Sequence, residues 1–283
     1  MFKYRIISFV GLLGILAAAF LWREGGKYIF TVLAVGGAFG LVYEVGGLLE
    51  LIGIVSFKKS TALAAVLLVL VTAMNYLDRW ISVTAFVLLF FIFLAGWAGL
   101  LYRDNRKSAI RQLINSLGML LLVILPVLPL VALYDDDWSR GICGAELIYL
   151  VLVTKAGDTG AYIVGMLSGK LLPHGNHKIV PKISPKKSWE GTIGGLFCSV
   201  AVSLAFFYGN FNLVATLWGS LFLGIVLFFG GFAGDLTESA LKRTCGVKDS
   251  GSIIPGMGGI FDVLDSFIYN GIIFFFIKAL FVV

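Results

Sequence analysis

The sequence predicts an all-α, polytopic integral membrane protein with about nine transmembrane helices and a cytoplasmic N-terminus. The first observation behind this prediction is composition. Of 283 residues, 59% are hydrophobic and only 13% are charged, whereas a soluble domain carries about 25% charged residues. So few charges cannot cover a water-facing surface, so a soluble globular protein is excluded and most of the surface must face lipid.

The second observation is the spacing of apolar runs, because a spanning helix needs about 20 apolar residues. Nine runs approach that length, at roughly 5–22, 28–50, 60–76, 81–101, 110–133, 142–156, 191–209, 212–233 and 266–282. The second run is weakened by Glu44 and Glu50, and the sixth is short. A signal peptide is the alternative for the first run, but its apolar length favours a transmembrane helix.

The third observation is the distribution of Lys and Arg, which together number 22 in a chain of net charge +6. With nine spans and the N-terminus inside, the cytoplasmic segments hold 16 of them and the opposite side holds four. Cytoplasmic loops of membrane proteins carry such an excess. The excess of basic over acidic residues therefore indicates membrane orientation rather than nucleic-acid binding.

Two regions follow from this layout: N-terminal transmembrane helices over 1–140 and a catalytic transmembrane region over 141–283. The second region contains two long cytoplasmic loops, 157–190 and 234–265, which hold seven of the 16 acidic residues. Glycine pairs such as Gly191 with Gly195 and Gly230 with Gly234 are typical of close helix packing rather than of ligand loops.

The loop 234–265 brings carboxylates to two helix ends. Asp235, Glu238 and Lys242 are spaced to share one helical face, and Asp262 and Asp265 stand where the last helix begins. Carboxylate oxygens are the ligands that Mg²⁺ takes when it also holds phosphates. The plainer alternative is that these acids pair with nearby cations, namely Lys242, Arg243 and Lys248.

The loop 157–190 adds another acid and a basic segment. Asp158 interrupts an apolar stretch, and an acid at membrane depth requires a partner, either a metal or Lys155. The basic segment interleaves lysines with prolines and hydroxyls, at Lys178, Pro181, Lys182, Ser184, Pro185, Lys186, Lys187 and Ser188. Such a segment suits a phosphate-bearing ligand, although a loop that binds anionic lipid head groups would have the same composition.

Taken together, these segments resemble the phosphatidate cytidylyltransferases, also called CDP-diacylglycerol synthases. The similarity runs from Lys155 to Ser266 and includes DTGAYIVG, KISPKKSWEG, GDLTESALKR and VKDSGSIIPGMGGIFDVLD. From Ser239 to Asp265 the chain follows the family pattern SxxKRxxxxKDxxxxxPGHGGxxDRxD, with Met257 in place of His and Val263 in place of Arg. Either these two positions are dispensable in this branch of the family, or the chain has lost activity or changed substrate. Because every candidate metal carboxylate is present, we expect the first.

The resemblance implies transfer of CMP from CTP to phosphatidic acid, giving CDP-diacylglycerol and pyrophosphate, with Mg²⁺ as cofactor. By resemblance, Asp235 and Asp262 are the principal metal ligands, Asp265 and Asp158 are secondary ligands, and Glu238 orients a ligand. The catalytic set is Asp235, Asp262, Lys242 and Lys187. The substrate-binding set is Lys182, Ser184, Lys186, Ser188, Arg243, Lys248 and Asp249.

The implied location is a bacterial cytoplasmic (inner) membrane, with the active site at its cytoplasmic face. The partners are CTP, phosphatidic acid and the lipid bilayer, without nucleic acid; a homodimer and a second metal or monovalent cation are left open. Two other functions also remain open, a CTP-dependent lipid-alcohol kinase and a secondary transporter of an anionic metabolite.

Overall fold

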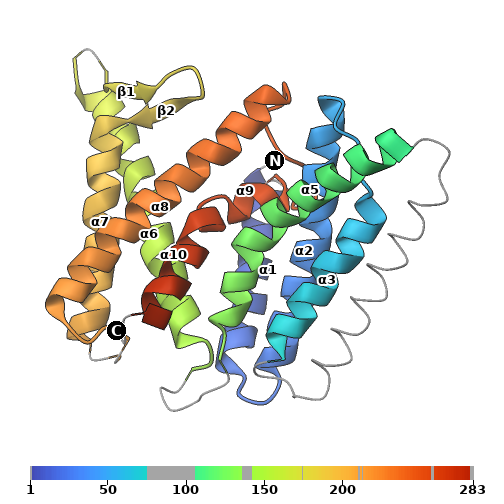
Figure 1. Cartoon of the computed structure of the whole chain (residues 1–283). Coiled ribbons are helices and arrows are strands. Elements are labelled where there is room, and N and C mark those ends of the chain that lie inside the picture. The colour runs from blue at the N-terminus through green and yellow to red at the C-terminus, as the bar shows by residue number, and fades with distance from the viewer. Residues whose placement is uncertain are drawn as a thin grey trace. The chain divides into compact units, whose positions relative to one another are not determined.

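The computed structural model of this chain describes residues 2–74, 106–135, 142–173, 175–209, 211, 213–255 and 258–280. These residues are mostly helical (Figure 1). They divide into two compact units, the first formed by 1–143 with 244–263 and the second by 144–243 with 264–283. Each unit is described by itself. The division of the chain at residue 140 stays a prediction.

The first unit is built from long apolar helices. They are α1 (Phe2–Leu21), α2 (Gly26–Leu51), α3 (Lys58–Ala73) and α5 (Arg106–Ala132), joined by the start of the short helix α9 (Ile260–Leu264). Helix α2 packs against α1, α3 and α5. Its side chains Leu41, Val42 and Val45 are fully buried, as is Val123 of α5. The core of this unit therefore lies along α2.

The second unit contains the remaining elements. They are α6 (Ala145–Leu171), β1 (Lys178–Val180), β2 (Ser184–Ser188), α7 (Trp189–Tyr208), α8 (Leu217–Thr244) and α10 (Phe267–Leu280). Helices α6 and α7 pack closely along their length (Figure 1). A Cβ atom built on Gly195 would lie 2.7 Å from the carbonyl oxygen of Gly157 and 2.9 Å from Cβ of Ala161. The prediction of close helix packing is confirmed for Gly195.

Buried polar side chains tie the helices of the second unit together. The hydroxyls of Tyr149 and Ser203 lie 2.6 Å apart, which joins α6 to α7. The Asn270 amide of α10 donates to Thr154 Oγ1 of α6 at 2.8 Å and to the carbonyl of Leu227 in α8 at 2.7 Å. In an apolar setting, hydrophobic burial between helices does not favour one helix arrangement over another. Interhelical hydrogen bonds of this kind do favour one arrangement.

The chain contains a small antiparallel hairpin, so the prediction of an all-α fold is wrong for this segment. Strands β1 and β2 pair Lys178 with Ser188 and Val180 with Ser184. Pro181 follows β1 directly and, having a fixed φ and no N–H, favours the turn. Strand β2 leads into α7 without a break, and the Ser188 hydroxyl accepts a hydrogen bond from the Gly191 N–H at 3.2 Å, which caps that helix.

Within the part of the chain that the structure describes, five helices are long and apolar enough to cross a membrane. They are Gly26–Leu51, Lys107–Ala132, Ala145–Leu171, Trp189–Tyr208 and Leu217–Thr244, and shorter apolar helices cover Val10–Leu21 and Phe267–Leu280. The expected span 81–101 lies outside the described residues. The number of nine spans and the orientation of the N-terminus stay predictions.

Two boundaries differ from those expected. Residues 157–171 belong to α6 and residues 234–244 belong to α8, so both predicted loops begin later than their bounds of 157 and 234. The helical face shared by Asp235, Glu238 and Lys242 was predicted, whereas the continuation of α6 was not. In α6 the polar residues do not end the helix because Lys155 and Asp158, three positions apart, pair with each other at 3.0 Å. Charged residues can therefore continue a spanning helix beyond the point where hydropathy falls.

Candidate active site

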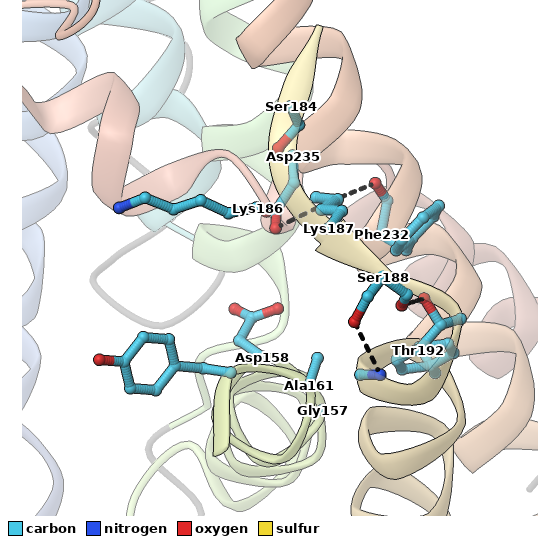
Figure 2. Close-up of a pocket in the computed structure, with 13 residues that line it drawn as sticks. Gly157, Asp158, Ala161, Ser184, Lys186, Lys187, Ser188, Thr192, Phe232 and Asp235 are labelled. Atoms are coloured by element: carbon cyan, nitrogen blue, oxygen red, sulfur yellow. Dashed lines mark hydrogen bonds and ion pairs between the residues drawn. The ribbon is translucent and has the colours of Figure 1, made fainter. Parts of the chain in front are cut away.

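A cavity of about 250 Å³ lies in the second unit between α6, β2, α7 and α8 (Figure 2). Its polar lining includes six residues that the sequence singles out. These are Asp158, Ser184, Lys186, Lys187, Ser188 and Asp235. The apolar side is formed by Phe228, Phe232 and Ala161, among others. The fold thus brings most of the predicted second-unit site residues to one hollow.

Lys187 of β2 and Asp235 of α8 form an ion pair in this cavity. The Lys187 ammonium lies 3.2 Å from Asp235 Oδ2 and 3.3 Å from the carbonyl oxygen of Phe232. It also lies 4.1 Å from the centre of the Phe232 ring, a cation–π arrangement. Figure 2 shows the Lys186 side chain extending away from this pair. Lys187 is therefore held in place, whereas its neighbour is exposed.

The other oxygen of Asp235 is unsatisfied. Asp235 Oδ1 is buried and has no hydrogen-bond partner among the residues that the structure describes. A buried carboxylate oxygen without a partner is costly. Such an atom is a natural position for a cation or a substrate group.

A second cluster surrounds the ammonium of Lys155. This ammonium lies 3.0 Å from Asp158 Oδ2, 2.7 Å from Ser266 Oγ and 3.9 Å from Asp265 Oδ1. The Ser266 hydroxyl lies 3.1 Å from both carboxylates. The requirement of Asp158 for a partner is met by Lys155. Burial raises the pKa of Asp265, and the ammonium of Lys155 opposes that shift.

The remaining candidates of α8 lie apart from the cavity lining. Glu238 is buried and lies 2.6 Å from the Lys242 ammonium, as the plainer interpretation of this acid expects. Arg243 and the hairpin residue Lys182 are exposed. Their predicted contacts with substrate phosphates stay predictions.

Asp262 belongs to the first unit. Its Oδ2 accepts hydrogen bonds from the Gly259 N–H at 2.7 Å, the Ser250 N–H at 3.1 Å and the Ser250 hydroxyl at 3.0 Å. Lys248 and Asp249, in the same unit, are exposed. Because Asp235 lies in the other unit, joint metal binding by these two aspartates stays a prediction.

Comparison with known proteins identifies the family. The sequence profile of the cytidylyltransferase family matches residues 3–281. The chain belongs to this family. A protein from Haemophilus influenzae named phosphatidate cytidylyltransferase is 34% identical over 284 residues, which cover 94% of each chain.

Two further relatives of the same name come from Staphylococcus haemolyticus and Staphylococcus aureus. They are 49% and 48% identical to this chain over 124 residues, which is 44% of this chain and 45% of each relative. The chain therefore spans a little under half the length of these staphylococcal cytidylyltransferases. The resemblance inferred from the motifs is confirmed.

Of the two departures from the family pattern, Val263 lies in α9. Met257 lies outside the described residues. The expectation that both positions are dispensable therefore stays a prediction.

The oxygen donors of the described residues bear on metal binding. In the described part of the chain, no three His, Cys, Asp or Glu side chains lie close enough together to hold a metal ion. The reason is visible in the geometry: lysines occupy the space between carboxylates. The donor chemistry nevertheless fits Mg²⁺, because Asp158, Asp235 and Asp265 offer hard oxygens and one of those oxygens is unsatisfied.

Some site residues of the second unit were not included in the predicted set. Lys155 was considered only as a partner for Asp158, and Ser266 was not considered, yet they join Asp158 to Asp265. The available signal was a lysine three positions before an acid in an apolar helix. The contribution of Ser266 depends on a pairing between residues 108 positions apart, which no local pattern contains.

Proposed function

We propose that this chain is a phosphatidate cytidylyltransferase, which transfers CMP from CTP to phosphatidic acid and releases pyrophosphate. The observation that carries the proposal is its membership of the cytidylyltransferase family, with one relative of that name aligned over 94% of the chain. The cavity in the second unit supports it, because that cavity combines lysines, serines and carboxylates.

Charge neutralisation is the main task of such a site, since CTP and phosphatidic acid are both anionic. Lys187 is suited to it. Its ammonium has three N–H donors, two of which are directed to Asp235 and to the carbonyl of Phe232. The remaining donor is suited to a substrate phosphate oxygen. The exposed lysine next to it, Lys186, lines the same cavity and adds positive charge.

The reaction is a phosphoryl-type substitution at the α-phosphorus of CTP. A phosphate oxygen of phosphatidic acid forms the new bond to that phosphorus, and the bond to the oxygen that bridges to the β-phosphate breaks. The bonding electrons leave with pyrophosphate. The attacking phosphate is already ionised at neutral pH, so no general base is required, and catalysis depends on alignment and charge neutralisation.

Mg²⁺ belongs to the proposal as the cofactor. The residues that would hold it are Asp235, Asp158 and Asp265, with Asp262 as the predicted ligand from the first unit and Glu238 as an orienting residue. When bound, a magnesium ion supplies Lewis-acid neutralisation of phosphate oxygens. Lys155 and Lys187 hold the carboxylates Asp158 and Asp235 by ion pairs.

The proposed setting is the cytoplasmic face of a bacterial inner membrane. There the nucleotide arrives from water while the diacyl tails of the lipid stay in the bilayer. The bias of basic residues toward the predicted cytoplasmic segments supports this orientation. A homodimer stays open.

The test is a transfer assay with purified protein in detergent–phosphatidic acid micelles. CTP labelled at the α-phosphate should give labelled lipid in the presence of Mg²⁺, while CTP labelled at the γ-phosphate should give labelled pyrophosphate and unlabelled lipid. Glu50→Gln serves as a matched control, because Glu50 pairs with Lys58 at 2.6 Å in the first unit and has no proposed role in catalysis.

The two labels separate the alternatives. Lipid labelled only from γ-labelled CTP would identify a lipid kinase instead. If neither label reached lipid, and the protein carried an anionic metabolite into CTP-free liposomes, a transporter would replace the proposal.

A further inference from the structure

Glu44 is an acid in the middle of the apolar helix α2, and the proposed mechanism does not use it. Its side chain is buried, with 7% of its surface exposed. A carboxylate inside an apolar helix is unfavourable unless its oxygens are satisfied. Among the described residues Glu44 forms no ion pair, so backbone and hydroxyl donors must satisfy it.

These donors come from the segment that contains the family signature. The N–H of Ile260 donates to Glu44 Oε1 and the N–H of Phe261 donates to Oε2, both at 2.9 Å. Both groups stand at the start of α9, where backbone N–H groups have no acceptor within the helix. A carboxylate from a residue more than 200 positions away thus caps the short helix that carries Asp262.

A shared hydroxyl connects Glu44 to Asp262. Ser250 Oγ lies 3.0 Å from Asp262 Oδ2 and 3.4 Å from Glu44 Oε2. Because a serine carries one hydroxyl hydrogen, the two carboxylates compete for a single donor. The Ser250 N–H, which donates to Asp262 at 3.1 Å, fixes the position of this serine relative to Asp262.

Glycines allow the Glu44 side chain to reach this segment. A Cβ atom on Gly251 would lie 2.7 Å from Glu44 Oε1, and one on Gly259 would lie 2.5 Å from Glu44 Oε2. Either distance is too short for a real contact, so any side chain at these positions would push the carboxylate away. The lack of a side chain at Gly251 and Gly259 therefore leaves room for the Glu44 carboxylate.

We propose that Glu44 is a positioning residue for Asp262: it caps α9 and, through Ser250, sets the direction in which the Asp262 carboxylate points. The N-terminal helices therefore contribute to the signature segment and do more than anchor the protein. The inference rests on the proposed function, because Asp262 is assigned there as a ligand of Mg²⁺.

The test variant is Glu44→Gln, which keeps the size of the side chain but replaces one acceptor oxygen by an NH₂ donor. Ile260 and Phe261 then cannot both find an acceptor, and α9 should shift. Glu50→Gln, on the same helix but in an exposed ion pair, is the matched control. Ser250→Ala, which removes only the shared hydroxyl, is a second variant in case Glu44→Gln fails to fold.

Two readouts are compared, the Mg²⁺ concentration that half-saturates turnover and direct Mn²⁺ binding to the purified protein, measured by electron paramagnetic resonance. We expect Glu44→Gln to raise both constants by about 10- to 100-fold, as loss of a ligand-orienting contact typically does. Ser250→Ala should move them in the same direction, and Glu50→Gln should leave them at wild-type values.

Unchanged metal constants in Glu44→Gln, with only a lower yield or melting temperature, would overturn the inference and leave the proposed function standing. If the wild type forms no CDP-lipid, the proposed function fails and Mn²⁺ binding decides alone. Weaker binding in Glu44→Gln then supports the positioning role, and equal binding overturns it.

Discussion

Lysine–carboxylate pairs dominate the candidate site at the scale of single residues. Lys187 is held by Asp235, and Lys155 lies among Asp158, Asp265 and Ser266. These lysines place a positive charge beside carboxylates inside a largely apolar unit. The same carboxylates are the proposed ligands of Mg²⁺, so each lysine would compete with the proposed metal for their oxygens.

Asp235→Asn should lower turnover of CTP and phosphatidic acid by about 100-fold or more, because it removes charge from the acid whose second oxygen is unsatisfied. The measurement is the α-label transfer assay at saturating Mg²⁺, on protein that elutes from size exclusion like the wild type. Turnover within threefold of wild type would exclude Asp235 as a metal ligand.

Lys155→Met should lower the free energy of unfolding by about 1–3 kcal/mol, because two carboxylates and the Ser266 hydroxyl lose their shared donor. Thermal unfolding in detergent measures this change. Lys155→Arg should retain most of the stability, and Lys59→Met, at an exposed position of α3, should change it by no more than about 0.5 kcal/mol. Equal melting temperatures for Lys155→Met and Lys59→Met would contradict the role of Lys155.

At the scale of elements, the close contact between α6 and α7 shapes the second unit. Glycines let the two helices approach until backbone meets backbone, and Ser188 at the end of β2 caps the start of α7. The cavity lies where this helix pair meets the hairpin and α8. Its shape therefore depends on the separation of α6 and α7.

Gly195→Ala should destabilise the protein by about 1–3 kcal/mol, the usual effect of overpacking a tight contact. Its added methyl group would meet the backbone oxygen of Gly157 at 2.7 Å. Gly47→Ala in α2 is the matched control, since nothing lies within 4 Å of its Cβ position. Melting temperatures in one detergent compare the two. A Gly195→Ala protein as stable as Gly47→Ala would mean that α7 moves away without loss.

The elements could be predicted from sequence to different degrees. Hydropathy located the long helices because burial in lipid depends on local composition. It misplaced the end of α6, where Lys155 and Asp158 satisfy each other inside the helix. The hairpin was missed because a pairing such as Val180 with Ser184 leaves little trace in a short, proline-containing, basic stretch.

The candidate site shows the same limit. Motif spacing identified the carboxylates and lysines, since each lies in a short motif that resembles the family pattern. The partners of those residues come from distant parts of the chain: Ser266 for Asp158, and Ile260 and Phe261 for Glu44. Such pairings depend on how helices pack, which the sequence pattern does not contain.

At the scale of the whole molecule, the open question is orientation in the membrane. The five long apolar helices among the described residues are suited by length and composition to span a membrane. The distribution of Lys and Arg predicts the side on which the hairpin lies. The proposed function requires that side to be the cytoplasm, where CTP is found.

Lys182→Cys, at the exposed turn of the hairpin, should react with a membrane-impermeant maleimide only after cells are opened. The native cysteines are first replaced by serine. Glu24→Cys, in the exposed turn after α1, is predicted to lie on the opposite side and should react in intact cells. The reverse pattern would invert the predicted orientation and place the hairpin outside.

The fit between Glu44 and its two glycine neighbours has a consequence for variation within the family. At Gly251 the atoms that would block a side chain all belong to Glu44, whereas at Gly259 the Ser250 hydroxyl blocks it as well. A relative with a small residue at position 44 would lose the cap of α9 and, at the same time, free space at Gly251. Positions 44 and 251 should therefore change together among homologues.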